Sequence, residues 1–380
     1  MSCCACTRRS CSARPCSSSS AGTPENRAGG PRSVQAPETW RREQEHLNGF
    51  VLGAELAFAP AALVSLGASA LLITRLERLS ARLRLPEALL GLIVALAADA
   101  PEVTSAVSAL ASGQRDVGAG VILGSNAFNL AALLGLAAIV AGRIALHRRV
   151  VLLEGAVALW LAAVAIALAT GVIASLPALA LALAVLLPYG VVSAVHPARR
   201  RTLPLPARWT DWLAGAISDE ELELTQALSA RSGGPLDAVT AAAALIVVVV
   251  ASVVMEQTAV RIGARYAVPG ILTGALVLAA VTSLPNMVSA IYLARRGRAS
   301  ATLSTALNSN TLNVLAGLLL PAVIIGAPAP SPGVLLTAGW YGGLTIAVIA
   351  VALARRGLSR GSGIFIVLAY LALVPALLTA

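Results

Sequence analysis

The sequence predicts an all-α membrane protein of about ten transmembrane helices, arranged as two inverted-topology repeats of five helices. Three observations predict this fold: long apolar runs, Arg concentrated in alternate loops, and a motif pair that recurs 184 residues apart. Of the 380 residues, 57% are hydrophobic and 12% are charged, with a mean hydropathy of +0.81. A soluble domain is about 25% charged, so an ordinary cytosolic globule is excluded. Aromatic residues, at 4%, are too few for an outer-membrane barrel.

Ten apolar segments are long enough to cross the hydrocarbon core of a bilayer. They span about 50–73, 86–111, 117–141, 150–170, 172–195, 237–259, 268–294, 301–326, 332–353 and 362–379. The chain then divides into four parts. These are a disordered polar tail (1–45), a first five-helix repeat (46–195), a cytoplasmic loop (196–236) and a second five-helix repeat (237–380).

Two polar regions carry residue types that bind metals, but both favour a simpler interpretation. The five cysteines lie in the first sixteen residues, in spacings that match no common zinc or haem pattern. Residues 219–223 of the long loop are acidic but lack EF-hand spacing. We interpret the first region as part of the polar tail and the second as a solvated linker.

The distribution of Arg predicts the orientation in the membrane. All 28 basic residues are Arg; the odd-numbered loops hold 18 of them and the even-numbered loops hold 3. Arg-rich loops are typically cytoplasmic, so both termini should lie outside. The net charge of +10 is therefore a topology signal, and no nucleic-acid partner is expected. The expected partners are the lipid bilayer and cations. Compact loops favour a multi-pass protein of the plasma membrane, and we expect this to be the inner membrane of a prokaryote.

An internal repeat appears when the chain is aligned with itself at an offset of 184 residues. Residues 101–129 and 285–313 then share 8 identities in 29 positions without a gap. The identities include Pro101/Pro285, Gly113/Gly297, Ser125/Ser309, Asn126/Asn310 and Asn129/Asn313. Because each half holds five spans, the second half enters the membrane from the opposite side. Inverted repeats are typical of secondary transporters, whose substrate site lies near the midplane.

The repeated segments carry oxygen ligands inside apolar helices. Pro101 and Pro285 free the carbonyls of Ala97 and Val281 for a cation. A carboxylate at a helix centre costs about 2.5–3.5 kcal/mol, and Asp99 and Glu102 lie near one another at i, i+3 spacing. Such residues usually mark an ion path, although a neutral, hydrogen-bonded acid is an alternative.

The following helix of each half adds neutral oxygens that suit a hard cation. Ser125 and Asn129 share one helix face, as do Ser309 and Asn313. Such residues can also join helices by hydrogen bonds. Other acids near span ends are expected to be interfacial or hydrated: Glu55, Glu87, Glu154 and Glu256.

These two segments resemble the α-repeats of the cation/Ca2+ exchanger superfamily, the sodium/calcium exchanger membrane proteins. The family pattern is Gly-Thr-Ser-x-Pro-Glu followed by Gly-Ser-Asn-x-x-Asn (or Asp), once in each half. The resemblance covers residues 50–380. It implies a secondary active antiporter with a midplane cation site and alternating access, exchanging Ca2+ for Na+ or H+. The first repeat offers Glu102, Ser125 and Asn129, and the second offers Thr282, Ser283, Ser309 and Asn313.

The chain departs from this pattern at the acidic positions, so its second repeat is atypical. Ala98-Asp99 replaces the first Thr-Ser, and Asn286 replaces the second acid. Asp99 and Glu102 together still offset the charge of one Ca2+. The expected cation ligands are Glu102, Asp99, Asn286, Ser125, Asn129, Thr282, Ser283, Ser309 and Asn313.

Two other functions were weighed against this one. A degenerate member of the family would carry another cation or would not transport at all. An intramembrane enzyme is disfavoured. An aspartyl protease needs two facing Asp residues on separate helices, and Asp99 is the one Asp that lies well inside an expected span; no zinc-protease or Walker motif occurs. We therefore expect a transporter rather than an enzyme, with transported ions and no cofactor.

Overall fold

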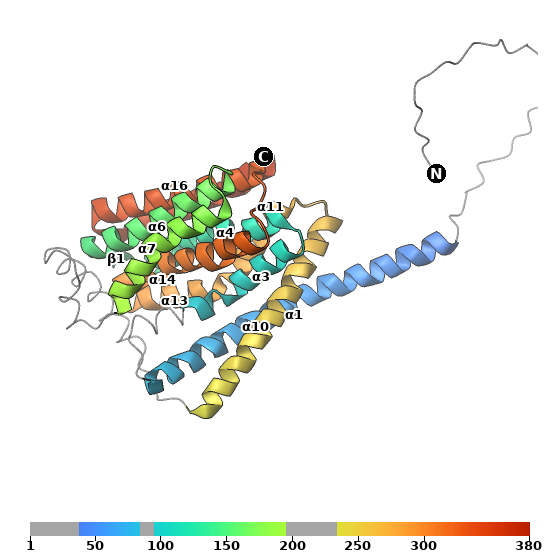
Figure 1. The fold of residues 1–380 in the computed structure, drawn as a ribbon, viewed down its shortest axis with the longest axis horizontal. Helices are drawn as coiled ribbons and strands as arrows, with labels where there is room; N and C mark the ends of the chain where they lie inside the picture. The colour runs from blue at the N-terminus through green and yellow to red at the C-terminus, as the bar shows by residue number, and fades with distance from the viewer. Residues whose placement is uncertain (1–37, 84–94, 195–233) are drawn as a thin grey trace, which may run out of the picture. The chain divides into compact units, whose positions relative to one another are not determined.

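The structure, a computed structural model, describes residues 38–83, 95–194 and 234–380. The cysteine tail, the acidic stretch and residues 86–94 of the expected second span lie outside these residues. Within them every regular element is a helix except for two short strands (Figure 1). The elements are α1 (Glu38–Leu83), α3 (Ala100–Ala111), α4 (Arg115–Asn129), η1 (Leu130–Leu136), α5 (Ala137–Ala141), β1 (Arg143–Ala145), α6 (Arg148–Ala169), α7 (Ser175–Ala194), α10 (Pro235–Arg265), α11 (Gly270–Leu272), η2 (Thr273–Leu278), α12 (Ala279–Thr282), α13 (Leu284–Arg295), α14 (Ala299–Leu312), η3 (Asn313–Leu319), α15 (Leu320–Ile324), α16 (Pro332–Arg355), β2 (Gly357–Ser359), α17 (Arg360–Leu371) and α18 (Leu373–Thr379).

The described helices confirm the all-α membrane fold. Eight are long and apolar enough to cross a bilayer. A ninth span is a pair of helical segments, Gly270–Thr282 and Leu284–Arg295, which are bent by 48° at the break between them. The expected span at 86–111 is described only from residue 95 onward, and α3 is its second part. The count of ten is therefore approximate.

The two repeats share the same turn between their helices. Gly113 and Gly297 have φ values of +78° and +72°, a conformation that favours glycine. In each turn the next amide reaches back to the helix: Gln114 N donates to the carbonyl of Ala109, and the equivalent Arg298 N donates to that of Leu293. This geometry is the Schellman ending of a helix. Each turn leads into a long helix, α4 or α14, that continues into a π-helical segment.

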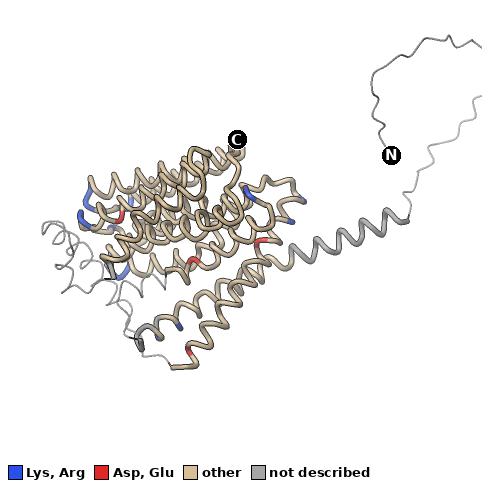
Figure 2. Tube along the Cα trace, in the orientation of Figure 1, with Lys and Arg blue, Asp and Glu red and all other residues tan. Residues whose placement is uncertain are grey.

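Loop contacts agree with the expected alternation of the spans. Strand β1, in the third loop, pairs antiparallel with β2, in the ninth loop. Six spans lie between these loops, an even number, so both must lie on one face of the membrane. The second and eighth loops also meet, because the Arg115 guanidinium donates to the Ala327 carbonyl at 3.4 Å. Arg residues lie mainly at the helix ends (Figure 2).

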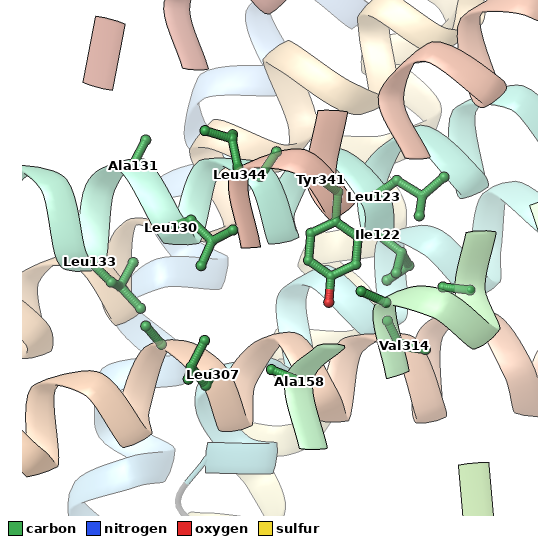
Figure 3. Packing of buried hydrophobic residues seen from close by; sticks show 14 of the residues in the cluster. Ile122, Leu123, Leu130, Ala131, Leu133, Ala158, Leu307, Val314, Tyr341 and Leu344 are labelled. Carbon is green, nitrogen blue, oxygen red and sulfur yellow. The ribbon is translucent and has the colours of Figure 1, made fainter. Parts of the chain in front are cut away.

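The spans that carry the repeated motifs lie at the centre of the bundle. In the most apolar stretches of Arg115–Ala141 and Ala299–Ile324, 83% and 67% of the residues are buried, against 11% in Ser175–Val192. Tyr341 of α16 is fully buried in the core around these helices (Figure 3). Gly124 of α4 touches the backbone of η2, since an added Cβ would lie 2.4 Å from the Ala275 Cα.

The expectation that Glu154 and Glu256 are interfacial or hydrated is wrong. Each is only 1% exposed. Glu154 on α6 accepts a hydrogen bond of 2.6 Å from the hydroxyl of Tyr189 on α7. Glu256 on α10 accepts one of 2.8 Å from the hydroxyl of Ser108 on α3. Position near a span end therefore did not reveal which helix face these residues occupy.

Candidate cation site

Two equivalent helix breaks supply the residues of the site. Asp99 precedes α3 with φ −84° and ψ −4°, and Ser283 precedes α13 with φ −82° and ψ −1°. Pro101 and Pro285 each lie two residues further on, in the first turn of the new helix, where a missing N–H costs little. The proline positions thus place Asp99 and Ser283 at matching points of the two repeats.

Two hydrogen bonds connect these breaks across the repeats. The Asn286 amide donates to Asp99 Oδ1 at 2.7 Å, and the Ser283 hydroxyl donates to Glu102 Oε1 at 2.8 Å. Position 99 corresponds to 283, and 102 to 286, so these are equivalent contacts in a pseudo-symmetric pair. In both of them the first repeat supplies the carboxylate and the second repeat supplies the donor.

Ser309 of α14 connects the carboxylates to the next helix of each repeat. Its hydroxyl donates to Asp99 Oδ1 at 2.6 Å. Its oxygen accepts hydrogen bonds from the amides of Asn129, at 3.1 Å, and Asn286, at 3.3 Å. Four of the nine predicted ligands, Asp99, Asn129, Asn286 and Ser309, are therefore joined in one network.

The sequence analysis did not assign a role to Asn126 and Asn310, which form the symmetric centre of the site. The amide of each donates to the backbone carbonyl of the other, at 3.1 Å and 3.0 Å. Their side-chain oxygens accept hydrogen bonds from Asn313, at 3.2 Å, and Asn129, at 3.1 Å. Three of these bonds join α4 to α14, and the bond from Asn313 joins α4 to the first residue of η3. Identity at the 184-residue offset was the signal that could have identified this pair.

Several buried oxygens of the predicted ligands have no hydrogen-bond partner. Within the part of the chain that the structure describes, five such atoms belong to the site: Asp99 Oδ2, Glu102 Oε2, Ser125 Oγ, Asn129 Oδ1 and Asn313 Oδ1. Buried polar atoms are rarely left without partners in proteins. Two of the five belong to carboxylates, three are neutral, and both repeats contribute. This is the type of donor set that a hard cation such as Ca2+ prefers.

Two expected ligands also take part in hydrogen bonds within the protein. The Thr282 hydroxyl is fully buried and donates to the Leu278 carbonyl of its own helix at 2.9 Å. The Ala97 carbonyl, which Pro101 removes from the helical ladder, accepts a hydrogen bond of 3.3 Å from Ser69 of α1. A hydroxyl group thus contacts the carbonyl that was expected to bind a cation.

Comparison with known proteins gives one family and several similar structures. A family model described as sodium/calcium exchanger protein matches residues 55–196 and 236–378. No curated protein matches the sequence significantly. The crystal structure of the H+/Ca2+ exchanger CAX is 14% identical, with a TM-score of 0.63, over 84% of this chain and 81% of that one.

Two further structures have the same fold. YfkE is 17% identical, with a TM-score of 0.55, over 85% of this chain and 92% of its own. The sodium-calcium exchanger NCX_Mj is 16% identical, with a TM-score of 0.51, over 86% of this chain and 99% of its own. At such low identity these likenesses describe the fold alone.

Proposed function

The chain belongs to the sodium/calcium exchanger protein family, and we propose that it is a secondary active antiporter that exchanges Ca2+ for Na+. The ion site is the buried network of α3, α4, α13 and α14. One observation carries the proposal: two fully buried carboxylates, Asp99 and Glu102, each keep one oxygen without a hydrogen-bond partner in the described part of the chain. The nine predicted ligands remain part of the proposal, with Asn126 and Asn310 as positioning residues.

The charge of the site matches a divalent cation. Asp99 and Glu102 together supply two negative charges, which offset one Ca2+. The unpartnered oxygens of Ser125, Asn129 and Asn313 add neutral ligands from both repeats. Ca2+ takes six to eight oxygens, and the backbone or water can supply the remaining ones. The family pattern has an acid at the position of Asn286. Asp99, which accepts a hydrogen bond from Asn286, supplies the negative charge that this acid would have carried.

The symmetry of the site supports transport by alternating access. The two equivalent hydrogen bonds, Asn286 to Asp99 and Ser283 to Glu102, join the helix breaks of the two repeats. The repeats are expected to cross the membrane in opposite directions. In inverted-repeat transporters, one bundle rocks against the other around such a midplane site. Each contact crosses between the repeats, so motion of one repeat against the other would remodel the coordination of the ion.

Exchange with protons is the alternative for the coupling ion. Asp99 and Glu102 lie one helical turn apart and are both buried, so two protons could replace one Ca2+ without leaving charge in the membrane. Asn286, an amide, cannot take part in such an exchange. The neutral oxygens from both repeats favour Na+, which binds through oxygen ligands and needs no titratable group.

Transport in proteoliposomes distinguishes the two coupling ions. Radioactive Ca2+ uptake would be measured with an outward Na+ gradient, an outward H+ gradient or no gradient. The proposal expects uptake that is driven by Na+ and lost in Glu102→Gln. Glu154→Gln is the matched control, since it removes a buried carboxylate that accepts its hydrogen bond from Tyr189 of α7. Uptake driven by H+ alone would assign proton coupling, and no uptake from folded protein would support a degenerate member.

We further propose that the protein lies in the prokaryotic inner membrane with both termini outside. The Arg-rich odd loops support this orientation. All five cysteines lie in the tail, so their replacement by Ser leaves a background for single-cysteine labelling. In cells, Ala329→Cys in the eighth loop should react with an impermeant maleimide, and Ser359→Cys in the ninth loop should not. The reverse pattern would contradict the orientation.

A further inference from the structure

A buried carboxylate on α10 lies outside the central site. Glu256 of α10 is 1% exposed, and the Ser108 hydroxyl of α3 donates to its Oε2 at 2.8 Å. Within the described residues, Asp237 forms ion pairs with Arg75 and Arg78, and no ion pair is found for Glu256. Buried charges in proteins are usually paired or coordinate a cation. In membrane helices they mark functional sites by default.

A line of polar residues along α3 connects Glu256 to the central site. Asp99, Glu102, Ser105 and Ser108 follow one another at intervals of three residues. On a helix of 3.6 residues per turn, each step rotates the side chain by about 60°, so the line winds half a turn over roughly 13 Å. The contacts follow this rotation: Glu102 meets Ser283 of the second repeat, whereas Ser105 and Ser108 meet α10.

Oxygens from three helices gather at the outer end of this line. The Ser105 hydroxyl donates to the backbone carbonyl of Ser252 on α10 at 3.5 Å. The hydroxyl of Ser252 lies 2.8 Å from that of Ser65 on α1. Ser252 and Glu256 are one turn apart, hence on the same face of α10. Ser65, Ser105, Ser252 and Glu256 are each buried. The junction thus combines one carboxylate with several neutral oxygens.

The inverted repeat does not reproduce this junction. At the 184-residue offset, Ser108 corresponds to Tyr292 and Glu256 to Leu72. Helix packing alone does not need a carboxylate here, because Leu72, at the equivalent position, is itself buried in an apolar setting. Glu256 is therefore a feature of one half of the molecule and calls for an explanation of its own.

We propose that Ser105, Ser108, Ser252 and Glu256 form a second cation site, which holds one Na+. A single carboxylate offsets one positive charge, so the junction suits a monovalent ion, and a bound Ca2+ would leave an uncompensated charge in the membrane. Hydroxyl and carbonyl oxygens complete the coordination of a hard cation. The site lies along α3 from the central carboxylates, and its occupancy does not depend on which ions the central site exchanges.

Direct Na+ binding tests this proposal separately from transport. Radioactive Na+ would be bound to purified protein carrying Asp99→Asn and Glu102→Gln, with choline replacing Na+ in the competition series. We expect this double variant to keep a saturable Na+ site. Adding Glu256→Gln should weaken that binding at least tenfold, and adding the matched Glu154→Gln should leave it unchanged. Failure of Ca2+ transport in the wild type would not alter these results.

Three outcomes would overturn the second site. The double variant could bind no Na+, Glu256→Gln could leave binding unchanged, or Glu154→Gln could weaken it equally. The first or second result would mean that Glu256 is a neutral acid that joins α10 to α3. Should the Glu256→Gln protein fail to fold, Ser105→Ala combined with Ser108→Ala keeps the carboxylate and removes two ligands. That variant should weaken Na+ binding severalfold, and unchanged binding would equally contradict the proposal.

Discussion

Asn286 of the second repeat donates a hydrogen bond of 2.7 Å to Asp99 of the first. The equivalent contact, from Ser283 to Glu102, measures 2.8 Å. Within both pairs the first repeat supplies the negative charge. The site thus has symmetric geometry and asymmetric charge, and several measurable consequences follow from this combination.

Exchanging the charge between Asp99 and Asn286 should preserve transport. Asp99→Ser alone removes one of two negative charges, and Asn286→Glu alone places a third carboxylate against Asp99. We expect each single change to lower Ca2+ uptake at least tenfold. The double variant restores a charge of −2 and one acid in each repeat, so its uptake should return to within a few-fold of the wild type. If the two losses of Ca2+ uptake instead multiply in the double variant, the two residues do not act in a shared site.

Asn126 should contribute to stability more than to ion choice. Its side chain joins α4 to Asn310 of α14 and to Asn313, the first residue of η3. Asn126→Ala breaks these bonds and leaves the buried Asn313 amide without its acceptor, at about 1–3 kcal/mol for an unsatisfied group. We expect a lower melting temperature for the purified protein.

Ser300→Ala provides the control for this change. Ser300 of α14 is fully buried, and its hydroxyl has no partner among the described residues. Its removal should leave the melting temperature nearly unchanged. An equal loss in both variants would show that polarity alone, rather than the paired amides, stabilises this helix.

Gly124 should be intolerant of even a methyl group. An added Cβ would lie within 2.4–2.8 Å of the Ala275 backbone, and a backbone cannot move aside as a side chain can. Overpacking of this kind costs about 1–3 kcal/mol. Gly124→Ala should therefore lower the melting temperature. Gly339→Ala on the exposed face of α16, where nothing lies within 4 Å, should not; a similar loss there would mean that packing against η2 is not the cause.

Much of this account could be predicted from the sequence. Apolar runs located the spans, and the shared Pro, Gly, Ser and Asn residues located the repeats. Asp99 and Glu102 could be predicted as site residues because acids near a proline are unusual in an apolar helix. Asn286 could be predicted because it matches Glu102 at the 184-residue offset.

The remaining features depend on how helices rotate and pack. Hydropathy does not determine which face of α10 carries Glu256, so its burial against Ser108 was not predicted. The bond from Ser69 to the Ala97 carbonyl requires α1 to lie beside the first helix break. The pairing of Asn126 with Asn310 depends on the close approach of α4 and α14. Each of these contacts joins residues of different spans, and no local pattern encodes them.

Radioactive Ca2+ uptake by Glu102→Gln proteoliposomes is the most direct test of the central claim. Glu102 is fully buried, and one of its oxygens has no partner among the described residues. The account predicts gradient-driven uptake by the wild type and by Glu154→Gln, with loss of uptake in Glu102→Gln protein that folds normally. Uptake at the wild-type rate in Glu102→Gln would contradict the assignment of the site.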